Sequence, residues 1–362
     1  FMSKIVYLLG AGASYGKRGK DKIKCEVERH DKDGRRIITT MNCPTLYRGV
    51  PIVSELPSRL FYMYAWLDDE INKIKNDSLD KRNLEKLAED INWLHNESGR
   101  HATIDTFAKK LYLIGQEDDY CRLKRAFTIF LMWEQMNKQP DIRYDSFFAA
   151  ILGDIYDDFP KEVSIVSWNY DCQLELAYRE YCRIDSISGI AKKLGVKDKE
   201  LGIKSDDSAG LKIMKLNGCA LIEDNHYILD PFFDTTQTPI GRVLSLYKHS
   251  EGDRTLLSFA WEKMDDEYKS MISTQVGDAE TVVVIGYSFP FFNRKVDRFL
   301  FESMPNLKNI YIQDPYADRI VQTLLSVIPS HIYPITKVEK ITTTVFGIRM
   351  MSSLRKYLLL AV

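Results

Sequence analysis

The stretch IVYLLGAGASYG at residues 5–16 decides the fold class. Five apolar residues lead directly into glycines at positions 10 and 12, which is typical of a buried strand that turns tightly into a helix. Similar apolar runs lie at 163–167, 211–216, 281–285 and 309–312, and helical patterns separate them. Strands that alternate with helices predict an α/β fold with a doubly wound, Rossmann-like parallel sheet.

Two segments interrupt this alternation. Residues 17–48 contain two polar runs around a turn, which predicts a small β-hairpin insertion. Residues 58–158 carry aromatic and aliphatic side chains at helical spacing, which predicts a large, mostly helical insertion with those side chains in its core. We therefore expect one domain over residues 2–362 that contains both insertions.

The composition excludes several classes of protein. A net charge of −1 and a pI near 6.7 give no reason to expect direct nucleic-acid binding. No apolar stretch is long enough to span a membrane. The six cysteines form no CxxC pair, so neither a zinc module nor a disulfide scaffold is expected. The prediction is a cytoplasmic protein with reduced thiols, no metal and no membrane partner.

The glycine turn favours a phosphate-bearing ligand. Gly10 and Gly12 would let the backbone approach a phosphate, and Ser14 would add a hydroxyl donor. The pattern is not a complete GxGxxG, because Tyr15 stands where the third glycine would fall, and no Gly-Lys-Ser/Thr follows. A tight structural turn without a ligand is therefore the alternative.

Further motifs follow the other strands in a fixed order. They are GVP at 49–51, SWNYD at 167–171, KLNG at 215–218 and IGYSFP at 285–290, together with IDTFAKKL at 104–111. In this order they resemble the sirtuin (silent information regulator) family, and in particular its zinc-free bacterial branch, which is similar to antiphage effectors that hydrolyse NAD. The motifs extend from Gly10 to about Pro315, which is most of the chain.

The resemblance implies that NAD is the substrate and that the bond between nicotinamide and ribose is cleaved. It assigns Asn169 to the nicotinamide ribose and Asp171 to the carboxamide. The pyrophosphate would lie against the glycine turn and the adenosine against the IGYSFP loop. The complete set of implied cofactor-binding residues is Gly10, Ala11, Gly12, Ser14, Pro51, Asp171, Gly218, Gly286, Ser288 and Asp314.

One position departs from the family pattern. Asn217 stands where the family has its catalytic histidine, and asparagine cannot accept a proton near neutral pH. Three interpretations are open. The chain is an inactivated form of a hydrolase, or a pseudoenzyme that binds NAD or ADP-ribose as a sensor, or a hydrolase that uses another base. His101 and His226 are the candidates for such a base.

The identity of the attacking group distinguishes the remaining functions. Hydrolysis to ADP-ribose needs only water and a closed pocket, whereas an NAD-dependent protein deacylase needs a peptide groove beside the missing zinc module. The resemblance further implies an antiphage role as a homo-oligomer, with a defence-system partner such as an ATPase. The apolar helical insertion also favours assembly, unless its side chains fill its own core. The alternative to an enzyme is a non-catalytic protein that binds a partner and whose glycine turn is only structural.

Overall fold

The computed structural model describes residues 4–30, 33–136, 138–153, 159–197, 211–224, 227–234, 236–252, 254–262, 265–330, 332 and 337–341. The chain forms two compact units. The sheet unit comprises Phe1–Gly16, Pro140–Cys219 and Ser258–Val362, and the helical unit comprises Lys17–Gln139 and Ala220–Leu257. Each unit is therefore assembled from segments that are distant in sequence.

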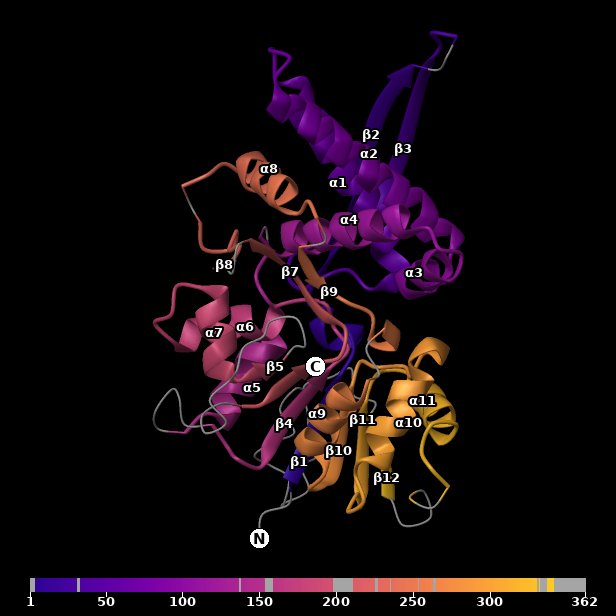
Figure 1. The fold of residues 1–362 in the computed structure, drawn as a ribbon, viewed down its shortest axis with the longest axis vertical. Helices are drawn as coiled ribbons and strands as arrows, with labels where there is room; N and C mark the ends of the chain where they lie inside the picture. Colours follow the sequence, from indigo (N-terminus) through magenta and orange to yellow (C-terminus); the bar gives the residue numbers. More distant parts are fainter. Residues whose placement is uncertain are drawn as a thin grey trace. The chain divides into compact units, whose positions relative to one another are not determined.

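The sheet unit contains a seven-stranded sheet in which every neighbouring pair is parallel (Figure 1). The strand order is β12-β11-β10-β1-β4-β6-β5. The strands are β1 (Lys4–Leu9), β4 (Val163–Ser167), β5 (Val196–Lys197), β6 (Ile213–Lys215), β10 (Ala279–Ile285), β11 (Asn309–Gln313) and β12 (Lys337–Ile341). This sheet confirms the predicted Rossmann-like α/β fold.

Helices cover both faces of the sheet. They are α5 (Ile142–Ile151), α6 (Gln173–Tyr178), α7 (Ile187–Leu194), α9 (Asp266–Val276), α10 (Arg294–Glu302) and α11 (Ala317–Leu325). Val6 and Leu8 of β1 join a buried core with residues of α9, α10 and α11. Tyr7 points to the opposite face, where its ring meets Phe147 of α5 at 5.2 Å. Strands buried on both faces require the continuous apolar runs seen in the sequence.

The chain reverses its direction of travel across the sheet between β1 and β10. From β1 it proceeds through β4 and β6 on one side, and it then crosses to β10 and β11 on the other side. In open α/β sheets, ligands bind at the carboxyl ends of the strands beside such a crossover. The loops that begin at Gly10 and Gly286 therefore occupy the position expected for a binding site.

These two glycine loops contact each other backbone to backbone. The Gly12 amide donates to the Gly286 carbonyl over 3.0 Å. A Cβ at Gly12 would lie 2.7 Å from the Gly286 Cα, and a Cβ at Gly286 would lie 2.4 Å from the Ala13 nitrogen. Gly286 also has a φ of +59°. The contact leaves no room for a side chain at position 12 or at position 286.

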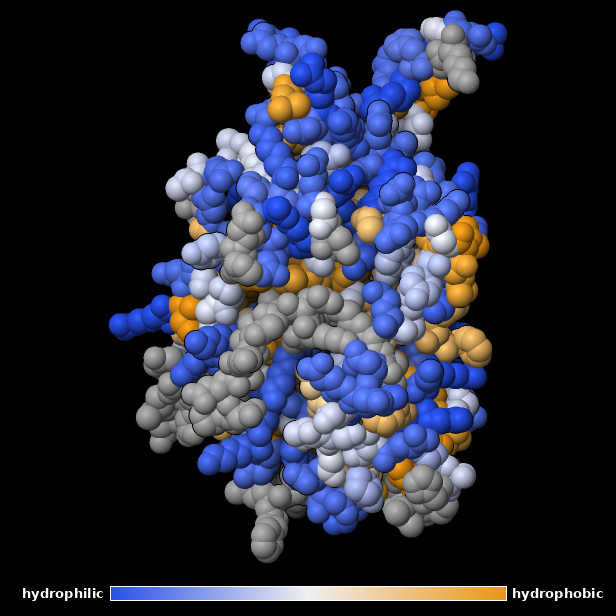
Figure 2. Space-filling model, viewed as in Figure 1, coloured by the Kyte–Doolittle hydropathy of each residue, from blue (hydrophilic) through white to orange (hydrophobic). Residues whose placement is uncertain are grey.

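The helical unit contains the predicted hairpin and helices, as well as a small three-stranded sheet. Figure 2 shows a mostly hydrophilic hairpin tip. Residues 220–257 belong to this unit, whereas α5, which falls within the 58–158 segment, belongs to the sheet unit. The elements are α1 (Leu56–Asn72), α2 (Leu79–Arg100), α3 (Ile104–Leu113), α4 (Glu117–Met136), α8 (Pro239–His249), the hairpin β2 (Arg18–His30)–β3 (Arg36–Leu46), and the sheet β8 (Tyr227–Ile228)–β7 (Gly218–Asp224)–β9 (Thr255–Leu257).

Most of the large apolar side chains of the helical unit lie in its own core. Phe61, Phe107, Phe127 and Phe130 are all buried. An exposed apolar group remains at the end of α3, at residues 112–114. Self-assembly and a partner protein stay predictions. None of the helices in the described part of the chain is long and apolar enough to cross a bilayer.

Gly286→Ala tests the contact between the glycine loops. We expect the variant to lose about 1–3 kcal/mol of unfolding free energy beyond the cost of a positive φ, because its methyl group overlaps the backbone of Gly12 and Ala13. Gly252→Ala is the matched control, since Gly252 has a φ of +79° but no atom within 4 Å of the place that a Cβ would occupy. Urea denaturation measures both variants. Equal losses would contradict the steric explanation.

Candidate functional site

The carboxyl edge of the parallel sheet brings the predicted site residues together. All of them except Pro51 belong to the sheet unit, and Pro51 belongs to the helical unit. Gly10 follows β1, Asn169 and Asp171 follow β4, Asn217 follows β6, and Gly286 follows β10. Gly218 comes directly after Asn217, Ser288 lies two residues after Gly286, and Asp314 follows β11. Because all of these strands run in the same direction, their exits lie at one edge.

The amides of the glycine turn are largely paired within the protein. Gly10 donates to Ile285 over 3.0 Å, Gly12 donates to Gly286 over 3.0 Å, and Ala13 donates to Gly10 over 2.9 Å. The 3₁₀ helix that follows, η1 (Ala11–Ser14), is only four residues long. The small residues of this turn are therefore explained by the contact between the loops, without a phosphate.

Arg143 of α5 adds a positive charge beside the glycine turn. Its Nη2 donates to the Gly12 carbonyl over 2.7 Å and to the Ala13 carbonyl over 3.1 Å. Asp141, which caps α5, binds both Arg143 and the Gly16 amide. Sequence analysis missed Arg143 because it is about 130 residues away from the turn that it contacts.

A buried hydrogen-bond network connects the turn to β4. The Ser14 hydroxyl lies 2.8 Å from the Tyr144 hydroxyl, and the Asn169 side-chain amide donates to the Ser14 Oγ over 3.1 Å. Burial raises the pKa of Tyr144, so that its hydroxyl remains protonated near neutral pH. The predicted residues Ser14 and Asn169 thus meet, and Tyr144 is the member that sequence analysis missed.

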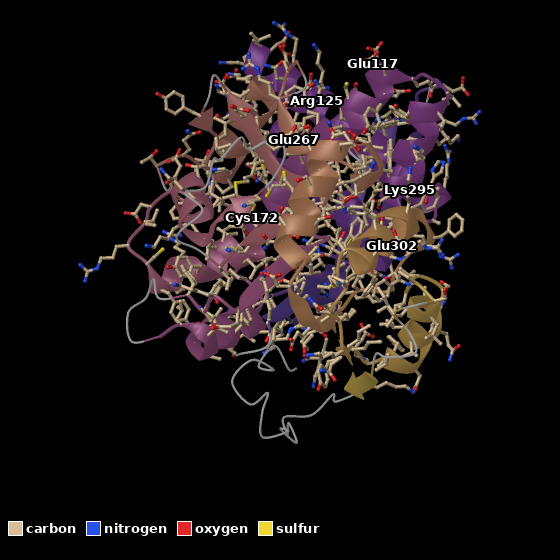
Figure 3. The ribbon with its side chains drawn as sticks, turned by 60° about the horizontal axis from the view of Figure 1, so that its bottom comes forward. Glu117, Arg125, Cys172, Glu267, Lys295 and Glu302 are labelled. Carbon is tan, nitrogen blue, oxygen red and sulfur yellow. The ribbon has the colours of Figure 1, made fainter. Side chains whose placement is uncertain are left out.

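Lys215 neutralises a second buried cluster. Its Nζ lies 2.6 Å from the Asp171 backbone carbonyl, 2.6 Å from a Glu175 carboxylate oxygen and 3.4 Å from the Cys219 sulfur. Burial raises the pKa of the Asp171 carboxyl, and the Lys215 ammonium opposes this shift. Cys172, labelled in Figure 3, has its sulfur 3.0 Å from that of Cys219, and both are free thiols. The Cys172 and Cys219 sulfurs and a Glu175 carboxylate oxygen lie within 4.8 Å of one another, a spacing at which they could also hold a metal ion.

Asn217 is held by backbone groups at both ends of its side-chain amide. The Nδ2 donates to the Trp168 carbonyl over 2.9 Å, and the Oδ1 accepts from the Ala260 amide over 3.1 Å. The residue is only 3% exposed. Asn217 therefore joins the loop after β4 to the segment that begins at Ser258, and this position has a structural role in addition to any chemical one.

Of the two histidines considered as alternative bases, the structure describes only His101. His101 lies in the helical unit, where it follows the last residue of α2. Its Nδ1 lies 3.0 Å from the Glu97 carbonyl, and its ring stacks on Phe107 at 4.6 Å. These contacts account for His101 as a structural residue. His226 lies outside the described residues.

A cavity of about 520 Å³ lies at the carboxyl ends of β10 and β11. Three of the predicted residues line it, and arginines and aromatic side chains complete the lining. Phe291 and Tyr316 are 71% and 75% exposed. The flanking helix α10 carries Lys295 and Glu302, which are labelled in Figure 3. The lining residues are Gly286, Ser288, Phe289, Pro290, Phe291, Arg294, Asp314, Tyr316, Arg319, Ile320 and Thr323.

Tyr287 anchors one wall of this cavity to the core. Its hydroxyl donates to the Asp297 carboxylate, at 3.0 and 2.9 Å from the two oxygens, and accepts from the Asn293 side chain over 3.0 Å. Its ring stacks on Trp168 at 5.5 Å. Burial raises the pKa of Asp297 well above its usual range, and the hydrogen bond from Tyr287 opposes this shift. These contacts of Tyr287 fix the loop that carries Ser288 to the core of the sheet unit.

Comparison with protein-family models, with curated proteins and with solved structures finds no match to this chain. The sirtuin resemblance therefore stays a prediction that rests on the motifs.

Asp297→Asn tests the buried carboxyl. A folded-state pKa above the unfolded one gives stability that is present at low pH and is lost as the pH rises through the folded value. Asparagine keeps an acceptor for Tyr287 and cannot ionise. We therefore expect the Tm of the variant, relative to the unmodified chain, to improve from pH 5 to pH 8.

The control for this variant is Asp278→Asn, whose side chain is 87% exposed. Its Tm difference from the unmodified chain should stay nearly constant over the same pH range. A constant difference for Asp297→Asn as well would mean that Asp297 is already ionised in the folded chain at pH 5, and it would contradict the raised pKa.

Proposed function

We propose that the sheet unit binds NAD or ADP-ribose, with the adenosine portion in the cavity at the ends of β10 and β11. The observation that carries this proposal is the lining of that cavity. Gly286, Ser288 and Asp314, which the motifs assign to the adenosine side, lie together there with Arg294 and Arg319. The cavity also borders the crossover of the sheet, where α/β proteins bind nucleotides.

The lining offers a group for each part of a nucleotide. A carboxylate such as that of Asp314 accepts hydrogen bonds from ribose hydroxyls. Arginine binds phosphate through charge-assisted hydrogen bonds. Exposed aromatic rings such as those of Phe291 and Tyr316 provide surfaces on which a base can stack. A bound nucleotide would also explain why these large side chains lie in the solvent.

The Ser14–Asn169 network supports the nicotinamide end of the proposal. An amide can hold a ribose hydroxyl or a water molecule without titrating, and the network fixes the Asn169 side chain at the edge of the sheet. Asp171 lies on the same loop, where burial raises the pKa of its carboxyl and the nearby Lys215 opposes that shift. These residues would orient the nicotinamide riboside portion.

We infer that the chain is a hydrolase scaffold that binds its nucleotide and turns it over slowly. Release of nicotinamide leaves positive charge on the ribose, which fixed dipoles in a buried site can stabilise. The missing element is a proton acceptor, because Asn217 cannot act as one and its amide is bound at both ends by backbone. A chain that binds NAD or ADP-ribose but lacks a proton acceptor would act as a sensor of that nucleotide. Antiphage activity and an ATPase partner are consequences of the resemblance alone.

Arg319→Met tests nucleotide binding. We expect at least about tenfold weaker binding of NAD and ADP-ribose, because a charge-assisted hydrogen bond to phosphate contributes about 1.5–3 kcal/mol. Calorimetry measures the affinity, and Arg298→Met on α10, outside the lining, is the matched control. Unchanged affinity in Arg319→Met would contradict this site. A substitution in the glycine turn, such as Gly12→Asp, cannot test nucleotide binding, because any side chain at Gly12 collides with Gly286 and disturbs the fold.

Asn217→His tests the chemistry. A histidine that keeps one of the two backbone bonds can present its other ring nitrogen as a base, so we expect nicotinamide release to rise by about 10²–10⁴-fold. The gain should disappear when Asn169→Ala is added. Equal rates for the unmodified chain and for Asn217→His would contradict the assigned role, and peptide-dependent release with an acyl-lysine peptide would favour the deacylase. A melting curve checks that the variant is folded.

A further inference from the structure

The helical unit contains a second cavity, of about 370 Å³, that the proposed function does not use. It is formed by the hairpin, by α1, by the end of α4 and by the start of α8. The label Arg125 marks α4 in Figure 3. The lining residues are Ile23, Thr45, Leu46, Arg59, Tyr62, Trp66, Trp133, Lys138 and Pro239. A volume of this size is within the range of small-molecule sites.

Three aromatic rings form one wall of this cavity. Tyr62 and Trp66 lie one turn apart on α1, and both rings contact Trp133 of α4, with centroid distances of 5.7 and 5.4 Å. Trp133 is buried, while Tyr62 and Trp66 are half-buried. A wall of tilted, partly accessible rings offers faces and edges against which a flat aromatic ligand can pack.

The floor of the cavity contains two basic side chains and one acidic side chain. Arg59 is 2% exposed, and its Nε lies 2.8 Å from a Glu134 carboxylate oxygen. The Lys138 side chain is 8% exposed and contacts the other oxygen of Glu134. Glu134 is completely buried. Two buried basic side chains thus share one buried carboxylate.

The neighbouring charges do not change this balance. Arg18 of the hairpin pairs with Glu55 at 2.6 Å, and together these two residues are neutral. Desolvation, with added repulsion from Arg59 and Arg18, lowers the pKa of Lys138 to about 6. An anion bound beside Lys138 would offset both effects, because it would restore the charged form of the amine.

We propose that this cavity binds a nucleotide-like ligand, with an aromatic ring against Tyr62, Trp66 and Trp133 and a phosphate at Lys138. The Lys138 Nζ lies 5.9 Å from the centroid of the Trp133 ring, so the amine adjoins the ring wall, and a nucleoside monophosphate carries the two matching groups. An apolar side chain of a protein partner would cover the rings but offer no anion to the Lys138 amine. The site is independent of the nucleotide site proposed in the sheet unit.

The test uses the full chain with AMP as the probe, together with adenosine and inorganic phosphate as its two halves. Calorimetry should give about two AMP molecules per chain, one in each unit, and AMP should quench the tryptophan fluorescence from Trp66 and Trp133. Lys138→Met removes the charge and leaves Glu134 paired with Arg59. We expect the affinity of the helical-unit cavity for AMP and for phosphate to fall by at least about tenfold in this variant. Calorimetry should then detect one AMP molecule per chain in place of two.

Trp66→Leu provides the second variant, because it removes stacking area and keeps the charges. It should weaken AMP and adenosine and leave phosphate unchanged. Arg319→Met should remove the sheet-unit site and leave the quenching intact. If Arg319→Met alone abolishes all AMP binding, or if Lys138→Met and Trp66→Leu bind AMP as the unmodified chain does, the proposal is overturned. Failure of the sheet-unit site alone would instead leave one AMP that depends on Lys138.

The affinity of this site should also fall between pH 6 and pH 8. The amine that is mainly neutral at pH 8 must take up a proton to bind a phosphate. The charged groups that face it are Arg59 on α1, Glu134 on α4, Arg18 on the hairpin and Glu55 before α1. Lys138→Met should abolish this pH dependence, and a pH profile that the variant retains would contradict the role of Lys138.

Discussion

The backbone contact between the loops at Gly12 and Gly286 is the constraint on which the edge of the sheet depends. β1 and β10 are paired up to Leu9 and Ile285, so the two loops leave the sheet side by side. Their close approach excludes side chains and uses the Gly12 amide as a donor. The loop from Gly286 must then send Tyr287 into the core and Ser288 outward. The orientation of the cavity wall follows from this turn.

The polar groups of the sheet unit divide into two kinds. Asn217, Lys215 and Ser14 are buried, and each is bound by other parts of the same unit. Such groups make the edge rigid, because each would be costly to leave without its partner. Arg294 and Arg319 are exposed beside the cavity and can turn toward a ligand. The helical unit differs, since its cavity places two basic side chains against one carboxylate in the interior.

The sequence by itself determined the fold class. Apolar runs such as Ile5–Leu9 and Thr281–Ile285 can only be satisfied when a strand is covered on both faces, and the intervening helices supply that cover. The polar hairpin and the helical insertion were also predictable from local periodicity. β5 and β12 were missed, because a strand of two residues and the polar run KVEKI carry no such signal.

Only the tertiary structure decided which contacts the candidate site residues make. Strand order brings Arg143 and Tyr144 to the glycine turn and brings Arg319 beside Ser288, and no local pattern encodes contacts between residues so far apart. The motif at Asn217 suggested a lost base, but its two backbone partners, which give it a structural role, are visible only in the folded chain. Likewise, the close approach of the loops at Gly12 and Gly286 is visible only in the folded chain, and the approach of a phosphate to the glycines stays a prediction. Sequence specifies which groups can bond, and packing decides which partners they reach.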